Sequence, residues 1–170
     1  MNTMNTVSTL AMPSPDMGNT TLADWQRRSQ SRFGRWLFAQ KLCRRAPYFR
    51  SIKPHFLELR PALCMVVMPY GRGTGGAGNT VHPLAIATLC ELTASTVTEA
   101  TLPPNMSWHS RGMTIEYLRP AESDITATAR LDKTDWGEAQ NIAVPVSAVD
   151  RNGREVVRAV ITIRVESKRG

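Results

Sequence analysis

Residues 79 to 92 read NTVHPLAIATLCEL, a stretch that places a single carboxylate, Glu91, inside an apolar helical pattern. Pro83 suits the first position of a helix, because its missing N–H would have no intrahelical partner there. His82 then precedes the helix. From Pro83 to Thr98, every residue other than Glu91 is apolar or small. The sequence therefore predicts a buried helix that carries one charge.

Two interpretations of Glu91 follow from this setting. An ionised carboxylate is rarely buried without a partner, because a low-dielectric environment disfavours the charged form and raises its pKa. Glu91 could face solvent or pair with an arginine such as Arg111 or Arg119. Alternatively, Glu91 could act directly in catalysis. Spacing along the chain leaves both interpretations open.

Alternating apolar patterns predict strands on both sides of the helix. The stretches after it are residues 111–118, 125–131, 142–146 and 157–165, and turn residues separate them. Pro145 favours an edge position or a bulge for the third of these strands. Two apolar runs, 56–59 and 62–68, precede the helix. We expect an α+β fold in which an antiparallel sheet wraps around one central helix, with a further helix at the N-terminus.

This order of elements resembles the hotdog fold, in particular the PaaI-like acyl-CoA thioesterases and the DUF4442 family. The resemblance covers about residues 47 to 166. In the thioesterase pattern, a His before the helix is followed nine positions later by an Asp or Glu. His82 and Glu91 keep that spacing. Residues 116–120, which read EYLRP, also resemble the family's strand after the helix.

The resemblance implies an acyl-CoA or other acyl-thioester hydrolase with Glu91 as nucleophile or general base. It also implies a cleft shared by two subunits, in a homodimer or a dimer of dimers, and a substrate carried by CoA or by an acyl-carrier protein. The family's Asn lies six residues before its His, where this chain has Gly76, so Asn79 is a looser candidate. Ser110 matches a polar position that some relatives aim at the substrate, and Arg111 is its neighbour.

One departure from the family pattern concerns the backbone N–H that stabilises the negative charge on the substrate's carbonyl oxygen during hydrolysis. Relatives commonly have a Gly after the His, whose N–H helps to polarise the substrate carbonyl, whereas Pro83 has no N–H. Losing one such donor typically lowers the rate about a hundred- to a thousandfold. The N–H of Leu84, another helix-terminal amide or the His82 ring would have to replace it. His82 could equally be a helix cap or an ordinary surface residue.

Three functions therefore stay open on this fold. Hydrolysis of acyl thioesters is the first. A non-catalytic acyl-CoA or lipid-binding protein is the alternative that Pro83 favours. A dehydratase or hydratase would need a His and an acid that converge on the acyl chain.

The excess positive charge lies entirely in the N-terminal part of the chain. The net charge is +7, and residues 1–60 hold ten Lys or Arg against three acids, whereas the remainder balances. Residues 22–45 predict one basic amphipathic helix, with Trp25, Phe33 and Trp36 near one face. This helix could pack on its own domain. It could also bind CoA phosphates, an acidic carrier protein or an anionic membrane surface as a peripheral contact.

The remaining features set limits on the protein class. We expect a flexible tail over residues 1–20 and a single domain over residues 21–170. The three cysteines are widely spaced and form no C-x-x-C pair, which favours reduced structural thiols in a cytoplasmic protein without a zinc site. No leader or membrane-spanning run is recognisable. No cofactor and no nucleic-acid partner are expected. The glycine run at residues 71–76 matches a dinucleotide-binding pattern, but the helix begins only at Pro83, so we expect a loop there.

Overall fold

The computed structural model describes residues 18–132 and 135–168, which build a six-stranded antiparallel sheet and its covering helices. The strands are β1 (His55–Arg60), β2 (Leu63–Met68), β3 (Met106–Tyr117), β4 (Ile125–Arg130), β5 (Gln140–Val149) and β6 (Glu155–Ser167). Their order is β1-β2-β4-β5-β6-β3, so β1 and β3 form the two edges. The six expected strands and their antiparallel pairing are confirmed.

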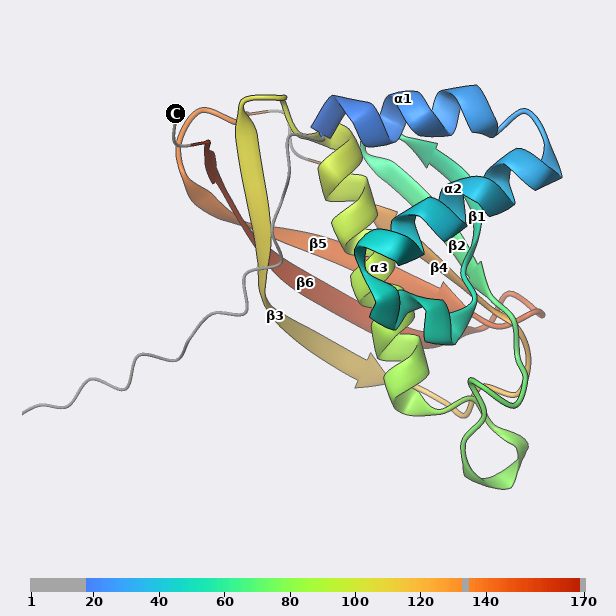
Figure 1. Cartoon of the computed structure of the whole chain (residues 1–170). Helices are drawn as coiled ribbons and strands as arrows, with labels where there is room; N and C mark the ends of the chain where they lie inside the picture. The colour runs from blue at the N-terminus through green and yellow to red at the C-terminus, as the bar shows by residue number, and fades with distance from the viewer. Residues whose placement is uncertain (1–17, 133–134, 169–170) are drawn as a thin grey trace, which may run out of the picture.

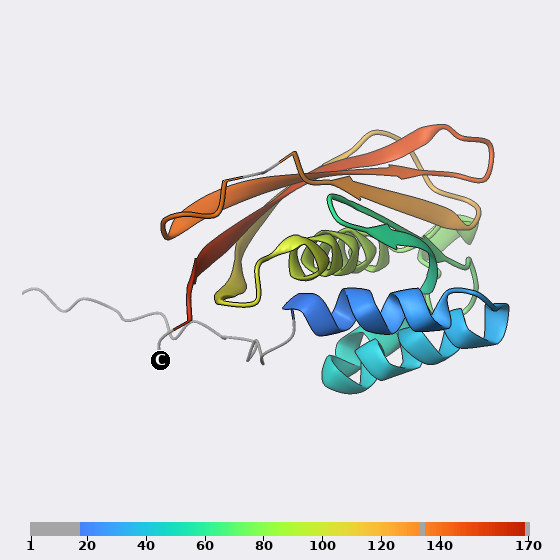
Figure 2. The same cartoon turned by 90° about the horizontal axis from the view of Figure 1, so that it is seen from above.

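The central helix α3 (Pro83–Thr101) lies against the concave face of the sheet (Figures 1 and 2). It tolerates burial although it contains several threonines, because their hydroxyls donate to carbonyls one turn earlier. Thr93 bonds to Leu89 at 2.7 Å and Thr98 to Ala94 at 2.8 Å. No buried side-chain nitrogen or oxygen among the described residues lacks a hydrogen-bond partner. The expected buried helix is confirmed, but it extends past Thr98 to Thr101 and so carries a second carboxylate, Glu99, which makes the prediction of one charge wrong.

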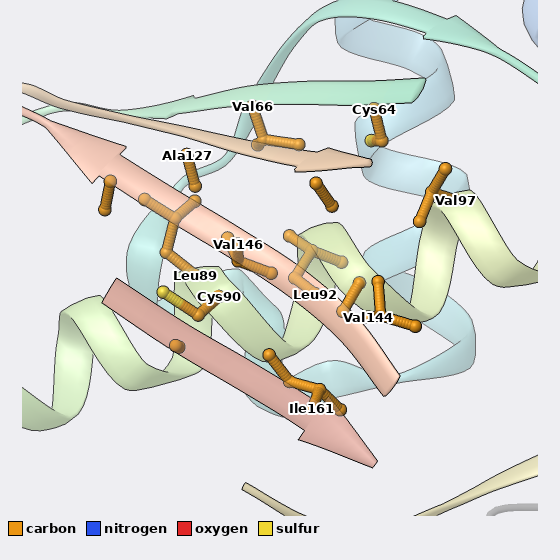
Figure 3. Close-up of a cluster of buried hydrophobic side chains, with 14 of the residues drawn as sticks. Cys64, Val66, Leu89, Cys90, Leu92, Val97, Ala127, Val144, Val146 and Ile161 are labelled. Atoms are coloured by element: carbon orange, nitrogen blue, oxygen red, sulfur yellow. The ribbon is translucent and has the colours of Figure 1, made fainter. Parts of the chain in front are cut away.

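The main core lies between α3 and the sheet (Figure 3). Leu89, Leu92 and Val97 from the helix meet strand residues such as Val144 and Ile161, and all five are fully buried. The described cysteines are free thiols. Cys90 is buried in this core, and its burial raises the pKa of the thiol to about 12, so it stays protonated near neutral pH.

The N-terminal region forms two helices, so the prediction of one helix over residues 22–45 is wrong. Helix α1 (Gly18–Arg28) and helix α2 (Arg32–Arg45) cover the side of α3 that faces away from the sheet (Figure 2). Ser31 caps α2 by accepting a hydrogen bond from the N–H of Gly34 at 3.0 Å. A side chain at Gly34 would clash with the carbonyl oxygen of Arg28. Gly34 therefore permits the sharp turn between the helices.

The expected tail falls largely outside the described residues. Residues 1–17 are not described, and the last three positions of that tail, residues 18–20, belong to α1. No helix in the described ranges has both the length and the apolar character needed to cross a membrane.

Two buried carboxylates fix the N-terminal helices in place. Glu99 on α3 accepts hydrogen bonds from Arg45 at 2.7 Å and from Thr21 at 2.8 Å. Asp24 on α1 lies 2.9 Å from Arg28 and 3.3 Å from Lys41. These contacts join α1 and α2 to the central helix. They also position the short 3-10 helix η1 (Pro47–Ile52), which follows α2 directly.

Two strand details differ from the expectations. Pro145 lies in β5, an interior strand, but β4 pairs only with residues 146–149 of β5, so the proline lies beyond the β4 ladder. Its missing N–H therefore costs no bond to β4. Strand β3 begins at Met106, earlier than the expected residue 111, and its pairing with β6 shifts between Ser110 and Gly112. This irregularity leaves Arg111 as an extra residue in the edge strand.

Candidate active site

The carboxylate of Glu91 forms the centre of the candidate site. Its side chain leaves α3 towards β3, where the hydroxyl of Ser110 donates a hydrogen bond to it. Burial raises the pKa of Glu91, and the Ser110 hydrogen bond lowers it in part. Neither Arg111 nor Arg119 forms an ion pair with Glu91 within the described ranges. Glu91 is thus a half-buried acid whose partner is a neutral hydroxyl.

A largely apolar groove of about 450 Å³ adjoins this carboxylate. One wall consists of residues 45–49 at the end of α2 and the start of η1. Leu84, Ala87, Thr88 and Glu91 from α3 and Met113 from β3 complete it. Among the described residues that line the groove, Glu91 is the single carboxylate. Such a groove suits an apolar chain with a reactive group next to Glu91.

His82 occupies the N-cap of α3 and is exposed. Its ring Nδ1 accepts a hydrogen bond from the N–H of Leu84 at 3.1 Å. The N–H of Ala85 donates to the His82 carbonyl at 2.9 Å. The Leu84 N–H, one of the groups that could replace the donor missing at Pro83, is therefore bonded to the His82 ring in this conformation. With Nδ1 as acceptor, the neutral His82 ring carries its proton on Nε2, where it can be donated.

Asn79 lies in the loop before α3, at the end of the short 3-10 helix η2 (Ala77–Asn79), and is exposed. Its backbone is left-handed, with φ of 59°. The N–H of Gly76 donates to the Thr80 carbonyl at 2.6 Å, and the N–H of His82 donates to the Thr74 carbonyl at 2.8 Å. These bonds keep Asn79 at the N-terminal end of the helix, together with His82. The glycine run forms part of this loop, as expected.

The predicted site residues therefore fall into two groups. Asn79 and His82 lie at the start of α3, whereas Glu91 and Ser110 lie further along it. Nine residues of helix span about 13 Å along the axis. Arg111 is exposed at the β3 irregularity, and the Leu84 side chain lines the groove at 63% exposure. The structure joins Glu91 to Ser110 but does not bring either residue to His82 within one chain.

The groove wall that η1 provides was not predicted from the sequence. Tyr48 and Phe49 follow the proline that starts η1, and both line the groove. Met113 lies on β3, three residues after Ser110. The sequence signal that was available is a pair of aromatic residues next to a proline, in a short segment without helical or strand periodicity. Only the packing of η1 beside α3 shows what they face.

A six-stranded antiparallel sheet wrapped around one helix, with a carboxylate from that helix beside an apolar groove, defines a hotdog-fold protein. The DUF4442 profile, described as a domain of unknown function, matches residues 34–165, and the chain belongs to this family. A comparison with curated proteins gave no match.

Solved structures support the same fold. A structural-genomics target, APC5556, is 34% identical, with a TM-score of 0.76 over 89% of this chain and 99% of that one. A probable thioesterase of unknown function from Pseudomonas aeruginosa is 19% identical, with a TM-score of 0.70 over 76% and 93%. A thioesterase from Haemophilus influenzae is 16% identical, with a TM-score of 0.66 over 75% and 87%. At these identities, the two thioesterases establish the hotdog fold rather than the reaction.

Proposed function

We propose that this protein hydrolyses acyl thioesters of the acyl-CoA class, with Glu91 as the group that activates water or attacks the carbonyl. The observation that carries the proposal is the Glu91 carboxylate, half-buried in the wall of an apolar groove and hydrogen-bonded by Ser110. Burial raises its pKa and makes the ionised form a stronger base. The thioesterases among the structural relatives support the same reaction class.

Two routes are consistent with this carboxylate. As a general base, Glu91 takes a proton from water while the water oxygen attacks the carbonyl carbon. The tetrahedral intermediate then releases the thiolate, which takes up a proton. As a nucleophile, Glu91 forms a mixed anhydride and expels the thiolate, and water then hydrolyses the anhydride. Both routes yield a carboxylic acid and a free thiol.

A complete site requires two subunits. His82 and Glu91 lie about 13 Å apart along α3, too far for both to contact one carbonyl. A two-fold axis that sets two α3 helices antiparallel would place His82 of one subunit beside Glu91 of the other. Strand β3 offers a free sheet edge for such pairing, since β6 is its only neighbour in the described sheet. We therefore infer a homodimer in which the exposed Nε2–H of His82 polarises the carbonyl.

One observation favours a second candidate function. The amides of Leu84 and Ala85 in the first turn of α3 both donate to His82, and Pro83 has no N–H. Without a donor from the His82 ring of the other subunit, the site would bind an acyl thioester without rapid turnover. Non-catalytic binding of acyl-CoA or lipid is therefore the alternative.

The deciding experiment measures free thiol released from a series of acyl-CoAs and acyl-carrier proteins. We expect turnover by the wild-type chain and a fall of about a hundredfold or more in Glu91→Gln, which keeps the shape of the side chain but removes the base. Glu122→Gln is the matched control, because Glu122 is exposed in the loop after β3. Equal turnover by wild type and Glu91→Gln would refute the catalytic role. Binding of acyl-CoA without any thiol release would support the second candidate.

A further inference from the structure

Helix α2 has a second apolar surface, which is exposed. Its inner face buries Phe38 against Trp25, with ring centroids 5.2 Å apart. On the outer side, the rings of Phe33 and Trp36 stack with centroids 5.7 Å apart, yet the two residues are 66% and 48% exposed. Helices α1 and α2 lie on the side of α3 opposite the sheet (Figure 2), and Trp36 lines a groove that α2 shares with the edge strand β1. Because only one of these two aromatic faces packs on the domain, the other is free to contact a partner.

The charges near this surface are positive and mostly lack acidic partners. Asp24, Glu58 and Glu99 hold the five cations that form ion pairs in this region. Within residues 18–60, the cations that form no ion pair with a described residue are Arg32, Arg35, Arg44, Arg50 and Lys53. This local excess attracts an anionic partner.

A small groove of about 160 Å³ lies beside the aromatic pair, between α2 and the edge strand β1. Its lining consists of Arg32, Arg35, Trp36, His55, Phe56 and Leu57. No acid belongs to this lining. Asp124, the acid that interacts electrostatically with His55, accepts a hydrogen bond from the N–H of Tyr70 at 2.9 Å and is paired with Arg151 at 3.1 Å. Two guanidinium groups and an imidazole around a small groove suit a phosphate group.

We propose that α2 and the adjoining end of β1 dock on an anionic phospholipid surface. Phe33 and Trp36 insert at the level of the headgroups, together with Leu57, which is 44% exposed. A lipid phosphate occupies the groove between Arg32 and Arg35. This docking is independent of the proposed hydrolysis, because none of these residues lines the Glu91 groove.

The size and composition of the surface favour a membrane over an acidic protein. Its apolar part is limited to the side chains of Phe33, Trp36 and Leu57, whereas a stable protein interface buries about 800 Å² on each partner. Membrane attachment needs only a few inserted side chains and nearby basic groups. Tryptophan with flanking arginine is also typical of membrane–water interfaces.

The test is co-sedimentation of the full chain with vesicles of phosphatidylcholine and phosphatidylglycerol, compared with phosphatidylcholine alone. We expect binding to the anionic vesicles only, weaker at high salt, with a blue shift of tryptophan fluorescence that Trp36→Phe removes. Replacing Phe33 and Trp36 by Ser should weaken binding about tenfold or more. Arg32→Gln and Arg35→Gln should each weaken it about fivefold.

Matched controls separate this surface from general charge and from the candidate active site. Arg72→Gln and Arg130→Gln remove exposed charges elsewhere and should bind nearly as wild type does. Glu91→Gln should also bind normally. The proposal is overturned if anionic vesicles do not bind, or if the Ser variants bind as wild type does. It is equally overturned if inorganic phosphate or an acidic carrier protein binds at this surface while vesicles do not.

Discussion

The hydroxyl of Ser110 on the edge strand β3 donates a hydrogen bond to the carboxylate of Glu91 on the central helix α3. The two residues are nineteen positions apart in the chain, and the bond joins the candidate catalytic acid to the strand irregularity at Arg111. It opposes the effect of burial on the pKa of Glu91. Several properties of the protein depend on this pair.

The pH dependence of activity should respond to Ser110. Ser110→Ala removes the hydrogen bond that lowers the pKa of Glu91 and leaves burial to raise it unopposed. Because the base works in its ionised form, the acidic limb of the kcat/KM profile should move to higher pH. Ser107→Ala is the control, since the Ser107 hydroxyl donates to the Glu166 carbonyl instead. An unmoved profile in Ser110→Ala would contradict the role of Glu91 as the base.

Stability should also depend on Glu91. Burial raises its folded-state pKa above the unfolded value, so the folded state binds the proton more tightly and loses stability as pH rises through that pKa. Gln has no such ionisation. Glu91→Gln should therefore be more stable than wild type at neutral pH, and the difference should shrink as pH falls from the raised folded-state pKa to the unfolded-state pKa of about 4.3, below which it should stay constant. Urea unfolding at several pH values checks this, and a pH-independent difference would speak against it.

Mixing two inactive variants tests the shared site. If His82 of one subunit serves Glu91 of the other, a heterodimer of His82→Ala and Glu91→Gln contains one intact site. An equal mixture should regain about a quarter of wild-type activity, because half of the dimers are mixed and each has one good site of two. His82→Ala mixed with the double variant His82→Ala/Glu91→Gln is the control, since no pairing of these two chains contains an intact His82 and no complete site can form. No recovery in the first mixture would mean that His82 and Glu91 do not act together.

Pro83→Gly should raise the rate of hydrolysis. The substitution supplies an N–H at the helix start, where the helix dipole also favours negative charge. We expect an increase of about tenfold or more in kcat, together with a small loss of stability from the more flexible backbone. Pro120→Gly, at an exposed position after β3, is the control. If the rate stays unchanged in a folded dimer, other groups polarise the carbonyl or hydrolysis is not the reaction.

The ion pair between Arg45 and Glu99 should contribute strongly to stability. Arg45→Met leaves the Glu99 carboxylate buried with only Thr21 as its described hydrogen-bond partner, which should destabilise the fold by about 3 kcal/mol. Arg60→Met breaks the exposed pair with Glu58 and should cost less than about 1 kcal/mol. Chemical denaturation compares the two. Equal costs would show that Glu99 does not fix the N-terminal helices.

The local pattern of apolar and polar residues was sufficient to predict most of the helices and strands. Period-two alternation located the strands after the helix, because one face of each strand is buried on α3 and the other is not. The proline and the apolar run located α3, whose threonines satisfy their own hydroxyls within the helix. Glu91 stood out for the same reason, as the single charge between Pro83 and Thr98, whereas the second carboxylate of the helix, Glu99, is paired with Arg45.

In the N-terminal region, the sequence pattern gave a wrong prediction of the helices. Residues 22–45 read as one amphipathic helix, but Ser31 and Gly34 stop and restart it. A serine or glycine within a helical pattern has only a small energetic effect by itself. The packing of α1 and α2 on α3, together with the ion pairs of Asp24 and Glu99, decides that the chain turns there.

The sequence by itself determined the helix, most of the sheet and the identity of the candidate acid, because burial periodicity and local propensity act over short distances. The tertiary structure alone decided that Ser110 is the partner of Glu91, that η1 walls the groove and that His82 bonds its own helix terminus. Those relationships join residues whose spacing carries no periodic signal. They exist because strand, helix and loop pack around one core, and only three-dimensional packing brings such groups within hydrogen-bonding distance.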